Sequence, residues 1–163
     1  MRIMLDMQGA QTESRFRGIG RYSLALARAI VLNASEHDVW IVLNANFPDT
    51  IEPIRDAFKG LLPAERIVVF SVPTLVSWES TDNIWRRRAA ELIRESFLSQ
   101  MQPDIIHLSS LFEGARFCDA VASVPSLGQH SVTALTLYDL IPLLKPDSYL
   151  GSDEAHQWYM DKI

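Results

Sequence analysis

The chain has 163 residues, of which 48% are hydrophobic and 21% are charged, and it carries a formal net charge of −5 at pH 7. This length supports one domain with its own core, and this balance excludes disordered and fibrous proteins. The negative charge disfavours nucleic acid as a partner, because nucleic-acid-binding domains usually present a basic surface.

Short apolar runs alternate along the chain with longer segments of helical periodicity. In chain order, the predicted elements are a strand at 3–7, a helix at 22–32, a strand at 39–43, a helix at 50–62, a strand at 67–70, a helix at 81–101, strands at 104–108 and 132–137, and a helix at 151–163. This alternation predicts an α/β fold, a Rossmann-like parallel sheet with helices on both faces. The helix at 81–101 is expected to gather its apolar residues on one side: Trp85, Ala89, Leu92, Ile93 and Phe97.

Local signals refine two of these boundaries. Thr50 is a good helix N-cap and is expected to begin the helix at 50–62. Pro53 then falls in or near the first turn, where proline is tolerated. Asp139 ahead of Ile141-Pro142 favours a turn after the last strand.

The last segment of the chain is rich in large side chains. It carries His156, Trp158, Tyr159 and Met160 and shows neither a cap nor a following element. Natural domain boundaries usually lie in polar linkers, so this segment suggests that the chain is a fragment of a longer protein. A C-terminal helix packed onto the domain is the alternative interpretation.

The first candidate site follows the first predicted strand, because ligands of open parallel sheets bind outside the carboxyl ends of the strands. There the segment Arg17-Gly18-Ile19-Gly20-Arg21-Tyr22 leads into a helix. Glycines allow a ligand to approach the backbone, a helix N-terminus favours an anion, and arginines such as Arg15, Arg17 and Arg21 suit phosphate. The spacing matches neither the G-x-G-x-x-G dinucleotide fingerprint nor a Walker A loop. The segment is therefore either an anion site or a structural loop at the helix entry.

Polar residues also follow the fourth and fifth predicted strands. His107 closes the fourth strand, ahead of Ser109, Ser110 and Glu113-Gly114, and Asp139 follows the fifth. His107 is either a hydrogen-bonded core histidine or a functional one, and Asp139 is either a turn cap or a general base. Because the carboxyl ends of parallel strands meet at one edge, we expect these groups to converge on one rim of the sheet.

Other features narrow the possible chemistry. Cys118 is the single cysteine, and we expect a small buried residue and not a nucleophile. No Cys/His spacing predicts zinc, and no Gly-x-Ser-x-Gly elbow is present. Arg86-Arg87-Arg88, after Trp85, is either a solvated helix face or a contact with an anionic membrane surface. No signal peptide or membrane span is recognised, so a cytoplasmic location is expected.

Three blocks of residues give the sequence a resemblance to a known family. They are Asp6 with Gln8-Gly9 and the segment Arg17 to Tyr22; Asp104-Ile105-Ile106-His107 leading to Leu111-Phe112-Glu113-Gly114; and Thr136-Leu137-Tyr138-Asp139-Leu140-Ile141-Pro142. In order and spacing they resemble the N-terminal domain of GT-B glycosyltransferases of the retaining family 4, the group 1 transferases of bacterial polysaccharide assembly. The likeness is greatest to mannosyltransferases of O-antigen and capsule synthesis, and it spans residues 1 to about 150.

The resemblance implies that 1–163 is the acceptor-side domain of a retaining, nucleotide-sugar-dependent glycosyltransferase. It implies a saccharide or lipid-linked saccharide as acceptor, with no metal and no other cofactor. Peripheral contact with the inner face of the membrane would be made by Trp85 and Arg86-Arg87-Arg88. The residues near the donor phosphates would be Arg17, Gly18, Gly20 and Arg21. The catalytic residues would be His107 and Asp139, and the acceptor-binding residues Gln8, Glu113 and Tyr138.

The chain also departs from the family pattern. Tyr138 stands where many members have a histidine that contacts the sugar. The donor-binding domain of the family, with its paired glutamates, is not in the sequence, so we expect the chain alone to be inactive. The alternative to a transferase is a stand-alone Rossmann-like or flavodoxin-like binding module without catalysis.

Overall fold

The computed structural model describes residues 1–78, 83–114, 118–126, 131–138 and 140–163. The strands are β1 Arg2–Asp6, β2 Asp38–Asn44, β3 Ile67–Phe70, β4 Ile105–Leu108 and β5 Val132–Leu135. The helices are α1 Gly18–Asn33, α2 Pro48–Phe58, α3 Ile84–Gln100, α4 Ile141–Leu144, α5 Pro146–Tyr149 and α6 Asp153–Met160. In the described part of the chain, the strands form one parallel sheet in the order β3-β2-β1-β4-β5. This arrangement confirms the predicted Rossmann-like α/β fold.

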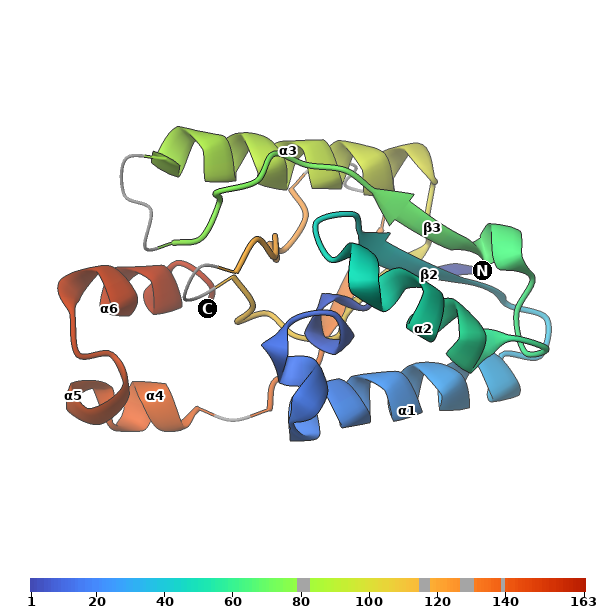
Figure 1. Ribbon diagram of the computed structural model, residues 1–163, viewed down its shortest axis with the longest axis horizontal. Coiled ribbons are helices and arrows are strands. Elements are labelled where there is room, and N and C mark those ends of the chain that lie inside the picture. The colour runs from blue at the N-terminus through green and yellow to red at the C-terminus, as the bar shows by residue number, and fades with distance from the viewer. Residues whose placement is uncertain (79–82, 115–117, 127–130, 139) are drawn as a thin grey trace.

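The sheet lies between two layers of helices, with α3 on one face and α1 and α2 on the other (Figure 1). Successive strand residues point to opposite faces, so each strand supplies both cores. On β1, Met4 packs in the core with Leu98 of α3, while Leu5 packs in the core with Ala27 of α1. Near-continuous apolar strands of this kind are typical of parallel sheets that are covered on both sides.

Several element boundaries differ from the sequence prediction, and three of the differences bear on the candidate site. Helix α1 begins at Gly18 and not at residue 22, so both glycines lie in its first turn. Helix α2 begins at Pro48, and its N-cap is Phe47 and not Thr50. Thr50 is a buried residue in the first turn of the helix. The predicted turn at 139–142 is replaced from Ile141 onward by α4, in which proline occupies the first turn, where its missing N–H is tolerated.

The predicted apolar side of α3 is wrong at three of its five residues, while Phe97 packs against the core as predicted. Trp85, Leu92 and Ile93 are exposed, and the buried positions of the helix are Ala90, Glu91, Arg94, Glu95 and Leu98. Three of these are charged, and a charge is tolerated inside a protein only where partners compensate for lost hydration. The face was misassigned because hydrophobic periodicity cannot identify a buried polar network.

The segment after β5 lies beside the carboxyl edge of the sheet. Helices α4 and α5 extend away from the sheet on the α1 side, and α6 returns toward α3 (Figure 1). In the described residues, no helix is both long enough and apolar enough to cross a bilayer.

Candidate functional site

The segments that follow β1 and β4 meet at the carboxyl edge of the sheet. After β1 the chain forms the 3₁₀ helices Gln8–Ala10 and Glu13–Phe16. The buried Glu113 carboxylate, after β4, accepts hydrogen bonds from Thr12 Oγ1 at 2.5 Å and Ser14 Oγ at 3.2 Å. Both bonds end on Oε2 of Glu113. Glu113, in the second block that the sequence singled out, is therefore bonded to the segment that links the two parts of the first block.

Tyr138, after β5, brings the third block against α1. Its hydroxyl lies 2.9 Å from Ser23 Oγ and donates to the Ser109 carbonyl at 3.0 Å. Its ring meets the Tyr22 ring edge-on, with 5.8 Å between centroids. Burial raises the pKa of Tyr138, so the phenol stays protonated at neutral pH. The predicted convergence of the three blocks on one rim is thus observed.

His107 lies on the α1 side of β4, because the residues before and after it belong to the core under α3. Its Nε2 lies 3.1 Å from Thr136 Oγ1. Burial lowers the pKa of His107, and the Asp6 carboxylate acts in the opposite direction. A neutral imidazole can accept a proton at pH 7. Asp139, the second predicted catalytic residue, lies outside the residues that the structure describes.

The two glycines of the first turn of α1 have different surroundings. A Cβ on Gly20 would lie 2.3 Å from Arg15 Cα and 2.6 Å from the Ser14 carbonyl oxygen, so the backbone of the preceding segment packs directly on this glycine. A Cβ on Gly18 would meet nothing within 4 Å. Gly20 therefore has a packing role, whereas Gly18 presents an open backbone.

The arginines around this turn also differ. Arg15 is engaged within the protein, since it forms an ion pair with Asp49 at 3.0 Å and donates to the Gln11 carbonyl at 3.0 Å. Arg17 and Arg21 are exposed, and neither forms an ion pair with another described residue. Arg17 is the N-cap of α1 and makes no side-chain capping bond. Its guanidinium has no acceptor with which to cap the N–H groups of the first turn.

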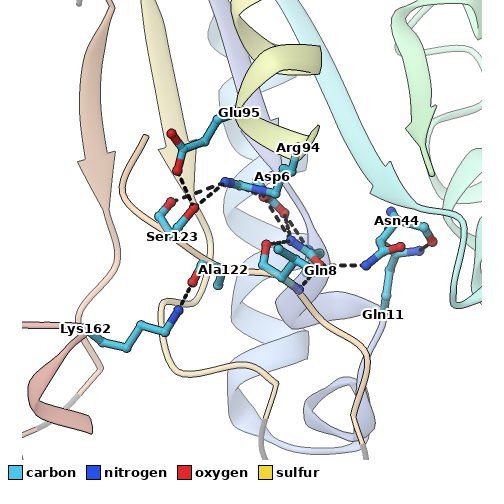
Figure 2. A network of polar contacts seen from close by, with 10 residues as sticks. Asp6, Gln8, Gln11, Asn44, Arg94, Glu95, Ala122, Ser123 and Lys162 are labelled. Carbon is cyan, nitrogen blue, oxygen red and sulfur yellow. Dashed lines mark hydrogen bonds and ion pairs between the residues drawn. The ribbon is translucent and has the colours of Figure 1, made fainter. Parts of the chain in front are cut away.

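A buried polar network lies beneath this edge (Figure 2). Arg94 of α3, with 0% of its side chain exposed, donates to Asp6 Oδ2 at the end of β1 from Nε at 2.8 Å and from Nη2 at 2.5 Å. Gln8 Nε2 also donates to this carboxylate, at 3.1 and 3.2 Å. The Gln8 side chain is buried, so the predicted acceptor-binding residue is placed inside the protein.

The same network holds the irregular segment 118–126 by its backbone and hydroxyl groups. Asn44 Nδ2 donates to the Asp119 carbonyl at 3.1 Å, and Glu95 accepts from Ser123 Oγ at 2.9 Å and from Ser126 N at 2.8 Å. Lys162 donates to the Ala122 carbonyl. None of these contacts was predicted from the sequence, because the partners are far apart along the chain.

Two aromatic residues near this edge, Trp78 and Phe112, stack on side chains of α6. The rings of Phe112 and Tyr159 stack with centroids 4.5 Å apart, and those of Trp78 and Trp158 stack at 5.7 Å. Offset stacking of this kind contributes attraction beyond the area it buries. Phe112 is next to Glu113 in sequence, so α6 supports the course of the chain at that carboxylate.

A shallow pocket of about 290 Å³ opens at the same edge, lined by Gln11, Thr12, Glu13, Arg15, Phe47, Asp49 and Cys118. Burial raises the pKa of Cys118, so its thiol is protonated at pH 7. This state agrees with the predicted unreactive cysteine, but Cys118 is half-buried and not buried as predicted. Among the described residues, no group of three or more His, Cys, Asp or Glu is placed to hold a metal ion.

The chain is similar to curated mannosyltransferases. It is 37% identical over 164 aligned positions to "Serotype-specific mannosyltransferase WbdA" of Escherichia coli, a match that covers 100% of this chain and 19% of the relative. A second protein of the same name and organism is 34% identical and is matched over 85% of this chain and 17% of its own length. No protein-family model matches the chain, and no solved structure matches it. Over its whole length the chain is thus homologous to one segment of these mannosyltransferases, a segment of about a fifth of their length.

Proposed function

We propose that this chain is the acceptor-side part of a retaining, nucleotide-sugar-dependent mannosyltransferase of bacterial cell-surface polysaccharide synthesis. The observation that carries this proposal is the 37% identity to a serotype-specific mannosyltransferase along the whole chain. The convergence of the segments after β1, β4 and β5 on one edge supports it, because this edge is where sheets of this topology bind ligands. The proposal places the donor-binding domain elsewhere in the full-length protein.

The proposed donor contact is the first turn of α1. The N–H groups of this turn and the cations of Arg17 and Arg21 favour the diphosphate of the donor. Gly18 leaves the backbone open to the phosphates, and Gly20 contributes by setting the position of the turn. These groups would stabilise the negative charge of the departing nucleoside diphosphate.

The proposed reaction and acceptor side lies next to this turn. His107 and Asp139 are the proposed catalytic residues, and Glu113 and Tyr138 the proposed acceptor contacts. Glu113 has one carboxylate oxygen, Oε1, without a bond to another described residue, and a carboxylate oxygen readily accepts a bond from a sugar hydroxyl. The amide of Gln8 is used within the protein, so its contribution to the acceptor site is indirect.

We also propose that no metal ion takes part, since the sequence has no Asp-x-Asp pair to hold a metal–diphosphate complex. Transfer by the full-length protein should then be unchanged by EDTA. Loss of transfer in EDTA, restored by Mg²⁺ or Mn²⁺, would overturn this part of the proposal.

The donor contact is tested by isothermal titration of the full-length protein with nucleoside-diphosphate sugars that include GDP-mannose. Arg17→Gln and Arg21→Gln should each weaken binding about tenfold, because each removes a charge-assisted contact to phosphate. The control is Arg55→Gln, which removes an exposed arginine that pairs with Glu52 on α2. Equal affinities for the three variants would remove the donor role of this turn. Binding of no nucleotide sugar by the wild type would favour a stand-alone binding module.

Peripheral membrane contact is proposed for the start of α3. Trp85 is 66% exposed, and the Arg86 guanidinium lies 5.4 Å from the centre of its ring. Aromatic and basic side chains together suit the surface of an anionic bilayer. In flotation with liposomes that contain anionic lipid, changing Arg86, Arg87 and Arg88 to glutamate should abolish association. Association that is unchanged in this variant would exclude the contact.

A further inference from the structure

The amide of Gln8 forms a two-way pair with the backbone of Val121. Gln8 Nε2 donates to the Val121 carbonyl at 2.8 Å, and Val121 N donates to Gln8 Oε1 at 2.8 Å. This side chain therefore takes the place that a neighbouring strand would occupy beside the irregular segment 118–126. Asn44 Nδ2 donates to Gln8 Oε1 as well, at 3.0 Å, so the donors and the acceptor of the amide are all engaged.

The ion pair between Asp6 and Arg94 determines the orientation of the Gln8 amide. The Asp6 carboxylate accepts from Gln8 Nε2 and from Arg94, so only the NH₂ group of Gln8 can face Asp6 (Figure 2). The carbonyl oxygen of Gln8 must then face Asn44 and Val121 N. The ion pair between Asp6 and Arg94 thus acts on Val121 through a side chain with one permitted orientation.

The segment that Gln8 holds is in direct contact with Gly114. Gly114 has a φ of +103°, and a Cβ at this position would lie 2.7 Å from the Ala120 carbonyl oxygen. Only glycine satisfies both requirements without strain. Gly114 follows Glu113, so the position of Ala120 and Val121 limits where the Glu113 carboxylate can lie.

We propose that Gln8 is a positioning residue that acts through Val121, Ala120 and Gly114 to hold Glu113 at the carboxyl edge of the sheet. The inference rests on the proposed function in one respect, namely that Glu113 contacts the saccharide acceptor. It gives Gln8 a role that needs no contact with a ligand.

The experiment uses Cys118 as a reporter, because its thiol lies against the backbone of Ala120 and Gly114. The rate of alkylation of Cys118 under native conditions is read by peptide mass spectrometry in the full-length protein. Gln8→Met keeps the length of the side chain and removes its hydrogen bonds. The control is Arg28→Met, which likewise removes a side-chain donor to a backbone carbonyl, that of Ala57 on α2, and has no bond to the segment 118–126. Affinity for a synthetic α-mannoside acceptor is measured in parallel.

Gln8→Met should raise the alkylation rate about tenfold or more, since the paired bonds to Val121 are lost, and should weaken acceptor binding. Arg28→Met should change neither, because the bond that it removes joins α1 to α2. Gly114→Ala alters the contact between Gly114 and Ala120 and leaves the buried network unchanged. It should also raise the alkylation rate and weaken acceptor binding. It replaces Gln8→Met if that variant does not fold. Alkylation rates that rise equally in Gln8→Met and Arg28→Met would overturn the inference.

Glu113→Gln separates failure of this inference from failure of the proposed function. If Glu113→Gln loses acceptor affinity and Gln8→Met does not, Gln8 does not position Glu113. If Glu113→Gln also keeps full affinity while the alkylation rates behave as expected, the loop is held as described and the acceptor role of Glu113 is wrong.

Discussion

At the scale of single residues, the energetics of the molecule centre on Arg94 and Asp6. Both side chains are buried, and their charges are compensated by each other, by Gln8 and by the Ser123 carbonyl. Such a pair adds little net stability compared with apolar residues, but removal of one partner leaves a buried charge without compensation. The pair joins α3 to the end of β1, so loss of either partner should weaken the packing between these two elements.

Arg94→Met should lower the free energy of unfolding by about 3–5 kcal/mol, measured by urea denaturation, because Asp6 then stays buried without its partner. The double variant Asp6→Asn with Arg94→Met should recover part of this loss. Arg55→Met is the control, and its exposed pair with Glu52 should contribute about 0–1 kcal/mol. Equal losses for Arg94→Met and Arg55→Met would show that the buried pair is not needed.

The pH dependence of stability should report His107. Burial lowers its pKa in the folded state below the ordinary 6.5, so the unfolded chain binds the proton first as the pH falls. The stability that the neutral imidazole preserves is complete above pH 6.5 and is lost as the pH falls from there toward the folded pKa. In thermal unfolding between pH 7.5 and 5.5, His107→Gln should show a shallower decline than the wild type. The exposed control His156→Gln should keep the wild-type slope, and a wild-type slope in both variants would contradict the prediction.

At the scale of elements, the start of α1 is a boundary that the sequence pattern did not predict correctly. Glycine is a poor helix former, so the sequence placed the start after the glycines. The structure begins the helix at Gly18, because the backbone of residues 14–15 packs on Gly20 and fixes the first turn. Tertiary contact outweighs local propensity at this position.

Gly20→Ala should destabilise the protein by about 1–3 kcal/mol, because the new Cβ meets backbone atoms that cannot move independently. Gly18→Ala lies in the same turn, meets nothing within 4 Å, and should change stability by less than about 0.5 kcal/mol. Thermal denaturation of the two variants measures the difference. Similar stabilities for both would refute the close packing at Gly20.

Helix α3 was located by its periodicity, but its orientation was not. Its buried positions Ala90, Arg94 and Leu98 are spaced by four residues, as a buried stripe requires, and Glu91 and Glu95 extend the same stripe. The positions of the apolar residues alone predicted that the side with Trp85, Leu92 and Ile93 is buried. Recognising the stripe would have required knowing that Asp6 and the segment 118–126 supply the partners.

At the scale of the whole molecule, β5 is one of the two edge strands of the sheet in the described part of the chain, the other being β3. Val132 and Leu135 are exposed, and the described residues of 131–138 include no charged side chain. Exposed edges of this composition favour pairing with another strand, because natural edges are usually protected by charges or proline.

The isolated chain should therefore associate at high concentration, and Val132→Lys should reduce this association without a loss of stability beyond about 0.5 kcal/mol. Sedimentation equilibrium measures the mass. Leu32→Lys is the matched control, since Leu32 on α1 is 63% exposed and Val132 is 65% exposed. Association that responds equally to both substitutions would show that the β5 edge is not the contact.

The sequence by itself determined the class of the fold, the strands and the three blocks that meet at the carboxyl edge, because these depend on hydrophobic periodicity and chain order. Only the tertiary structure decided what the polar residues do. Gln8 was predicted to bind the acceptor, and the structure adds that its side chain is buried and engaged with Val121; Arg94 was not predicted at all. The physical reason is that the environment of a polar group depends on its partners. Those partners lie 88 and 113 positions away in the chain, at distances where sequence patterns carry no information.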